Sequence, residues 1–112
     1  MPEDPIPRPG RPVRGSETGR PLMAALDLLG RRWTLRVIWE LRQGQVGFRE
    51  LQRRCERMSS SVLTTRLGEL TEARIVTIGE DGYTLTPLGE QLLDALHPLE
   101  KWGLTWEKAL RE

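Results

Sequence analysis

The strongest constraint on the fold is a change in the spacing of apolar residues at Arg74. Over residues 22–73, apolar side chains recur every three or four positions, the spacing of helices with one buried face. Two short β-prone runs follow, 75–78 and 83–86, and the Gly-Glu-Asp-Gly sequence at 79–82 between them is typical of a hairpin turn. The order predicts a mainly α fold with a small β-hairpin near its C-terminal end.

Capping residues predict where the helices begin and end. Gly30 and Gly44 follow two apolar runs, and Ser59 or Ser60 precedes another, as expected of helix ends and starts. Pro98 is expected to kink or break the last helix, because proline removes a backbone hydrogen bond. The expected helices are 22–29, 33–41, 48–55 and 60–73, followed by a long one that starts at Pro87 and continues to Leu110.

Length and composition predict one domain with an N-terminal arm. A chain of 112 residues is long enough for a single domain. Residues 1–21 contain six of the eight prolines and little apolar surface, so a disordered arm is expected there, with the folded domain at 22–112. One cysteine and one histidine cannot build a disulfide or a zinc site, so neither a metal nor a cofactor is expected. Without an apolar run for a membrane or an export signal, a cytoplasmic protein is expected.

The charges separate along the chain. Between Arg31 and Arg74 there are ten arginines and five acidic residues, a net charge of +5, whereas Ile75–Glu112 has three basic and seven acidic residues, a net charge of −4. Arginine without lysine suits phosphate, because guanidinium offers a planar set of donors. Composition alone leaves open that these arginines are merely solvated.

Three helices, a hairpin and a terminal helix follow one another in the order of a winged helix-turn-helix. In that architecture the helix at 60–73 packs one side on the core and offers the other to the DNA major groove. The arginines of the preceding helix would contact phosphates, and hydroxyl side chains would contact base edges; the alternative is ordinary exposed polar residues. The expected DNA contacts are Arg49, Arg53, Arg54, Arg57, Ser59, Ser60, Ser61, Thr64, Thr65 and Arg66, of which Arg66 could instead pair with a glutamate inside the domain.

No arrangement of residues typical of an enzyme is present in the sequence. A catalytic triad cannot be assembled around His97, which we expect to be a structural or dimer-interface residue. Phosphate-binding glycine motifs are absent from the sequence. Cys55 lies on the inward side of its helix, which favours a packed side chain over a redox thiol.

Four motifs together resemble the HxlR-type family of bacterial winged helix-turn-helix regulators, over about residues 22–110. They are Ala-Leu-Asp-Leu-Leu-Gly-Arg-Arg-Trp-Thr at 25–34, Phe-Arg-Glu-Leu at 48–51, Arg-Leu at 66–67 and Tyr-Thr-Leu-Thr-Pro-Leu-Gly at 83–89. The resemblance implies a transcriptional regulator that binds palindromic double-stranded operator DNA as a homodimer, held by its first and last helices. The apolar stripe of the last helix also exceeds what so thin a domain can cover, although monomeric packing is the alternative. The expected dimer interface comprises Leu22, Leu26, Leu92, Leu96, Leu99, Trp102 and Trp106.

Two departures from the family pattern limit what the resemblance implies. Arg20 stands where many relatives have a cysteine, so redox sensing there is unsupported. The wing is short, and Glu80 and Asp81 at its tip would be repelled by phosphate. An alternative function is therefore a winged-helix protein–protein interaction module with weak or no DNA binding. A small-molecule effector that binds near Trp33 and Trp102 is compatible with the first hypothesis.

Overall fold

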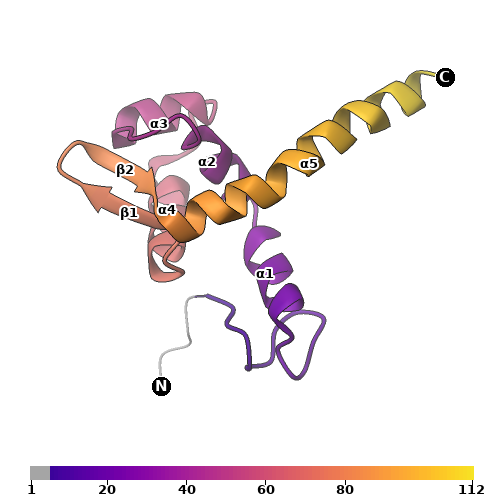
Figure 1. The fold of residues 1–112 in the computed structure, drawn as a ribbon. Coiled ribbons are helices and arrows are strands. Elements are labelled where there is room, and N and C mark those ends of the chain that lie inside the picture. Colours follow the sequence, from indigo (N-terminus) through magenta and orange to yellow (C-terminus); the bar gives the residue numbers. More distant parts are fainter. Residues whose placement is uncertain (1–5) are drawn as a thin grey trace.

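The computed structural model describes residues 6–112 and confirms a mainly α fold with one hairpin (Figure 1). The two strands pair antiparallel, with Val76 opposite Leu85 and Gly79 opposite Gly82. Outside the strands, Val46 forms a bridge with Tyr83. The elements are α1 Pro21–Leu29, α2 Thr34–Glu40, α3 Phe48–Arg54, α4 Ser60–Glu72, β1 Val76–Gly79, β2 Gly82–Leu85 and α5 Pro87–Arg111.

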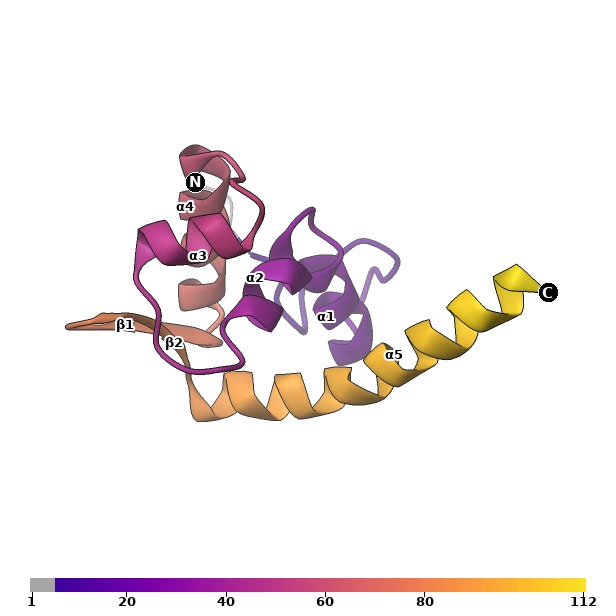
Figure 2. The ribbon, with the colours of Figure 1, turned by 90° about the horizontal axis from the view of Figure 1, so that it is seen from above.

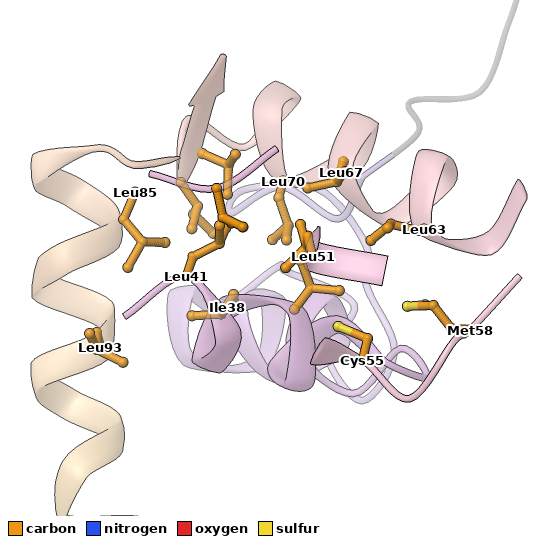
Figure 3. Packing of buried hydrophobic residues seen from close by; sticks show 14 of the residues in the cluster. Ile38, Leu41, Leu51, Cys55, Met58, Leu63, Leu67, Leu70, Leu85 and Leu93 are labelled. Carbon is orange, nitrogen blue, oxygen red and sulfur yellow. The ribbon is translucent and has the colours of Figure 1, made fainter. Parts of the chain in front are cut away.

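A single apolar core joins the helices to the hairpin. Ile38 of α2, Leu51 of α3 and Leu63 of α4 are fully buried and come together in Figure 3. Leu85 and Leu93 bring β2 and α5 to the same cluster. Burial of one such side chain stabilises a fold by about 1.5–3 kcal/mol, so these contacts fix α4 relative to α2 and α3.

A left-handed residue turns the chain from α4 into the hairpin. Arg74 has φ +64°, its amide donates to the Thr71 carbonyl at 3.0 Å, and the Ile75 amide donates to the Leu70 carbonyl at 2.9 Å. This pair of hydrogen bonds is the Schellman motif that closes many helices, usually with glycine at the left-handed position. The motif allows β1 to start directly after the helix.

The last helix begins at a tight contact and continues to the end of the domain. The Thr86 hydroxyl accepts a hydrogen bond from the Gly89 amide at 3.0 Å, and a Cβ at Gly89 would lie 2.2 Å from the Ile75 carbonyl oxygen. The expected break at Pro98 does not occur, since α5 is unbroken to Arg111 and only curves gently along its length (Figure 2). Proline removes one amide, and the surrounding turns keep their own hydrogen bonds.

Part of the N-terminal segment that is expected to form a disordered arm packs against the domain. Residues 6–20, which we call the N-terminal loop, follow a defined path against the domain, while residues 1–5 of the expected arm lie outside the described residues. The Gly10 amide donates to the Gly19 carbonyl at 2.8 Å, closing the loop. Ile6 is buried in the core cluster. Gly10, Gly15 and Gly19 have positive φ values, which glycine adopts without the strain that an L side chain would cause.

Candidate nucleic-acid interface

The exposed side of α4 carries small hydroxyl side chains. Ser59 caps the helix, since its Oγ accepts a hydrogen bond from the Val62 amide at 3.2 Å. The opposite side is buried through Leu63, Leu67 and Leu70. The residues expected to reach base edges are Ser59, Ser60, Ser61, Thr64 and Thr65, and all five are exposed. Because these side chains are small, the edge of a DNA groove can approach the α4 backbone closely.

Three of the expected phosphate-binding arginines face solvent beside α4. Arg49 and Arg53 lie on the exposed side of α3, and the Arg53 side chain is 72% exposed with its guanidinium on Glu50. Arg57 lies in the turn between α3 and α4, where it and Glu56 have φ values of +61° and +58°. The turn places Arg57 two residues before Ser59, the cap of α4.

Arg54 and Arg66 are instead used within the domain. Arg54 donates from Nε to Glu50 at 3.1 Å and from Nη1 to the Glu40 carbonyl at 3.3 Å. Arg66 donates from Nε to the Arg32 carbonyl at 2.8 Å and from Nη1 to Glu69 at 2.7 Å, and its side chain is only 20% exposed. Both guanidinium groups are therefore held by contacts within the domain, and the pairing of Arg66 with Glu69 is the alternative that the sequence left open. A DNA contact by either arginine stays a prediction.

Other arginines that tie the helices together were missed in the sequence. Arg36 of α2 donates to Glu40 at 2.8 Å and to the Arg54 carbonyl at 2.8 Å, which links α2 to the end of α3. Arg31 donates to Glu69, so one carboxylate holds two guanidinium groups. The i,i+4 spacing of Arg36 and Glu40 could have predicted their ion pair from the sequence. The pair of Arg31 and Glu69 spans 38 residues, so no local sequence pattern predicts it.

The wing is negatively charged, and it is closely tied to the domain next to its turn. Glu80 and Asp81 are exposed at its tip, and residues 75–86 contain no lysine, arginine or histidine. Gly82 has φ +136°, and a Cβ there would lie 2.3 Å from the Val46 carbonyl oxygen. DNA phosphates would repel the acidic tip of the wing. The described positive charges available for DNA contact therefore lie on elements other than the wing.

Comparison with known proteins identifies the family. The model of the HxlR-like helix-turn-helix family matches residues 28–111. The chain belongs to the HxlR-like helix-turn-helix family. The protein is 30% identical over 89 residues to the uncharacterized HTH-type transcriptional regulator YvaP of Bacillus subtilis (strain 168), which covers 73% of this chain and 82% of that one.

Solved structures of regulators share the fold. The quinone-bound YodB from B. subtilis is 30% identical with a TM-score of 0.72, and the match covers 76% of this chain and 97% of YodB. A transcriptional regulator of the MarR family from Enterococcus faecalis V583 is 34% identical with a TM-score of 0.71, covering 82% of this chain and 91% of that protein. This HxlR-like protein is accordingly a winged helix-turn-helix, DNA-binding transcriptional regulator, as the sequence predicts.

The seven residues expected at a dimer interface divide into two groups. Leu92 and Leu96 of α5 are partly buried and pack against the protein's own core. The other five, on α1 and the outer half of α5, are exposed; they are Leu22, Leu26, Leu99, Trp102 and Trp106. Trp102 and Trp106 stack with ring centroids 5.6 Å apart on the part of α5 that extends away from the domain (Figures 1 and 2).

Cys55 and His97 both pack against other parts of the domain. Cys55 is fully buried, and burial, followed by the nearby Glu40 charge, raises the pKa of its thiol despite the opposing effect of Arg36. The His97 ring meets the edge of Trp39 at 6.1 Å between α2 and α5. Within residues 6–112, no three His, Cys, Asp or Glu side chains come together as metal ligands, and no helix is long and apolar enough to cross a membrane.

Proposed function

We propose that this HxlR-like regulator binds its operator with α4 in the major groove and with Arg49, Arg53 and Arg57 on the adjacent phosphates. The observation that supports this arrangement is the exposed hydroxyl face of α4 flanked by three solvent-facing arginines. Serine and threonine can donate to or accept from base edges, while the arginines would provide affinity for any sequence.

The arginine contacts with phosphate carry a small energetic cost. Arg53 pairs with Glu50 at the surface, and exposed ion pairs contribute about 0–1 kcal/mol. Phosphate can therefore replace the carboxylate as the partner of this guanidinium. Release of counterions from DNA then favours binding and makes it depend on salt.

We further propose a homodimer formed through α1 and the outer half of α5. The support is the exposed apolar set of Leu22, Leu26, Leu99, Trp102 and Trp106, since aromatic side chains gathered on one surface are typical of interfaces. A two-fold dimer presents two copies of α4 to DNA, so the expected operator is palindromic. We place the protein in the cytoplasm, together with the DNA that it binds, and propose no catalytic role.

Replacing Trp102 with Glu tests the dimer. A carboxylate in the apolar surface should shift the protein to a monomer in analytical ultracentrifugation and weaken operator binding, with Lys108→Ala as a control that leaves both unchanged. A dimer that persists in the Trp102→Glu and Leu26→Glu variants would contradict this interface.

A small-molecule effector is also compatible with this function. YodB was solved bound to a quinone. In this protein we propose that any effector acts without thiol chemistry, because Cys55 is buried and its pKa is raised.

Binding to the DNA upstream of its own gene, measured across salt, tests the proposed function. Binding above that to random DNA, with affinity that falls steeply as salt rises, is expected. The absence of any DNA binding, together with a stable protein partner, would instead favour the interaction module that the acidic wing suggests.

A further inference from the structure

A hollow of about 730 Å³ lies where the N-terminal loop, α1, the end of α4 and the start of α5 meet. We call it the loop–helix cavity. Its lining is mostly apolar, with Ile6 from the loop, Leu28 from α1 and Leu92 from α5, and it includes neither Trp33 nor Trp102. Binding sites for small molecules have volumes of about 300–1,000 Å³ and apolar walls with a few polar groups. The loop–helix cavity therefore has the size and lining of a site for a small apolar molecule.

The polar groups of the loop–helix cavity favour a ligand with a negative charge. Glu72 is the only acidic residue among its described lining residues, and its Oε1 lies 2.7 Å from Arg8 Nη2. Arg74 also lines the cavity and is exposed, and no carboxylate of residues 6–112 forms an ion pair with its guanidinium. Gln91 adds an amide that can donate a hydrogen bond. A carboxylate on the ligand would therefore give Arg74 the partner that it lacks within the described chain.

We propose that the loop–helix cavity binds a small apolar molecule with one carboxylate, and that this ligand regulates DNA binding. The regulatory part rests on the DNA binding proposed above, whereas the binding of the ligand does not depend on it. This ligand would be held without a covalent bond, in agreement with the buried state of Cys55.

The walls of the loop–helix cavity are fixed by backbone hydrogen bonds. The Thr86 hydroxyl donates to the Arg74 carbonyl at 2.6 Å, which holds the end of α4 against the start of α5. The Arg14 amide donates to Asp27 at 3.1 Å, which fastens the loop to α1. A site with fixed walls loses little conformational entropy when a ligand binds, so more of the contact energy appears as affinity.

Helix α1 connects the loop–helix cavity to the proposed dimer interface. Ala24 and Leu28 line the cavity, whereas Leu22 and Leu26 are exposed and belong to the surface that we propose to meet the second copy. Ala73 places the end of α4 on the opposite wall. A ligand that shifts α1 relative to α4 would change the separation of the two α4 helices in the dimer. That separation determines how well the dimer fits the two half-sites of an operator.

Isothermal titration calorimetry of the full chain with two related compounds tests the class of ligand. Naphthoate is an apolar aromatic carboxylate, and naphthylmethanol is its uncharged analogue. Naphthoate should bind more tightly by about fivefold or more, because only its carboxylate can pair with Arg74. Equal affinities for the two compounds, or no binding of naphthoate at millimolar concentration, would overturn the proposal.

Two substitutions test where naphthoate binds. Arg74→Gln should weaken naphthoate binding by about fivefold or more and leave naphthylmethanol binding unchanged, whereas a merely structural role of Arg74 would change both alike. Ala25→Trp, at an exposed lining position of α1, should fill the cavity and weaken the binding of both compounds. The matched control is Arg111→Gln, which removes an exposed arginine paired with Glu107 at the far end of α5 and should change neither affinity. Naphthoate binding that either cavity substitution leaves unchanged would contradict this site.

Titration of operator DNA with and without naphthoate tests the regulation. Saturating naphthoate should change the operator affinity of the wild-type protein by about fivefold or more, and operator DNA should change the naphthoate affinity by the same factor. The operator affinity of the Ala25→Trp protein should not respond to naphthoate. A wild-type operator affinity that is independent of naphthoate would overturn the regulatory role. Failure of the wild-type protein to bind any DNA would instead contradict the proposed function, and calorimetry would still test the cavity.

Discussion

Val46 and Tyr83 exchange two backbone hydrogen bonds, of 3.0 and 2.8 Å, between the segment before α3 and the second strand of the wing. The two residues are far apart in the chain, and their bonds join the helix-turn-helix to the hairpin. The close approach requires Gly82, because a side chain there would collide with the Val46 carbonyl.

Gly82→Ala should therefore destabilise the protein. A Cβ at 2.3 Å from an oxygen forces the wing away from Val46, and the left-handed φ adds strain, for a loss of about 2 kcal/mol or more in the free energy of unfolding. Urea denaturation followed by circular dichroism measures this loss. Gly68→Ala is the control, since a Cβ there would meet no other part of the described chain within 4 Å and alanine favours helix; equal losses in both variants would contradict the explanation.

Arg74→Gly should stabilise the protein, in contrast to most substitutions. Arg74 occupies the left-handed position that ends α4, where an L side chain costs about 1 kcal/mol and glycine does not. The gain, up to about 1 kcal/mol, can be read from the same urea transitions. Arg74→Ala keeps the strained backbone and should show no gain, so a similar stabilisation by alanine would point to another cause.

Substitution of Arg66 should lower stability, whereas substitution of Arg53 should weaken DNA binding. Arg66→Ala leaves Glu69 with fewer donors and the Arg32 carbonyl without its guanidinium, so we expect a loss of about 1–3 kcal/mol of folding free energy. Arg53→Ala should change stability by less than about 0.5 kcal/mol and weaken binding to all DNA sequences. Unfolding and operator titration of each variant provide the comparison, and an Arg66→Ala protein of wild-type stability would restore this residue as a candidate for DNA contact.

The Cys55 thiol should be inert in the native protein and make stability fall at high pH. Because its pKa is raised in the folded state, the folded protein holds this proton more tightly than the unfolded chain does. Stability is then fully present below the ordinary pKa of 9.0 and decreases as the pH rises past it. A thiol reagent at pH 8 should label the protein only in denaturant, and Cys55→Ala should lack this decrease; rapid labelling of the native protein would contradict burial.

Features that depend on local spacing could be predicted from the sequence. The Ser59 cap and the leucine stripe predicted the boundaries of α4. Two glycines on either side of an acidic pair predicted the hairpin. Both patterns lie within a few residues of the element that they predict. The exposed hydroxyl face of α4 was predictable for the same reason. The exposure of Arg49, Arg53 and Arg57 agrees with the sequence, whereas Arg54 is only partly exposed.

Contacts between distant residues could not be predicted. Arg54 occupies a helix position that looks exposed in the sequence, and only packing brings the Glu40 carbonyl to it. For Arg66 the sequence left a pairing with glutamate open, but it did not indicate the hydrogen bond to the Arg32 carbonyl. The path of the N-terminal loop depends on Ile6 reaching the core and on Arg8 meeting Glu72, 64 residues away.

The outer half of α5 has a consequence for how the protein behaves at different abundances. Trp102 is 56% exposed, and its neighbour Trp106 and the exposed leucines of α5 have no apolar partner within the described chain that covers them. Association that buries these side chains stabilises the folded state by mass action. We expect the melting temperature to rise with protein concentration, so that a cell holding few copies of this regulator keeps a smaller fraction of them folded.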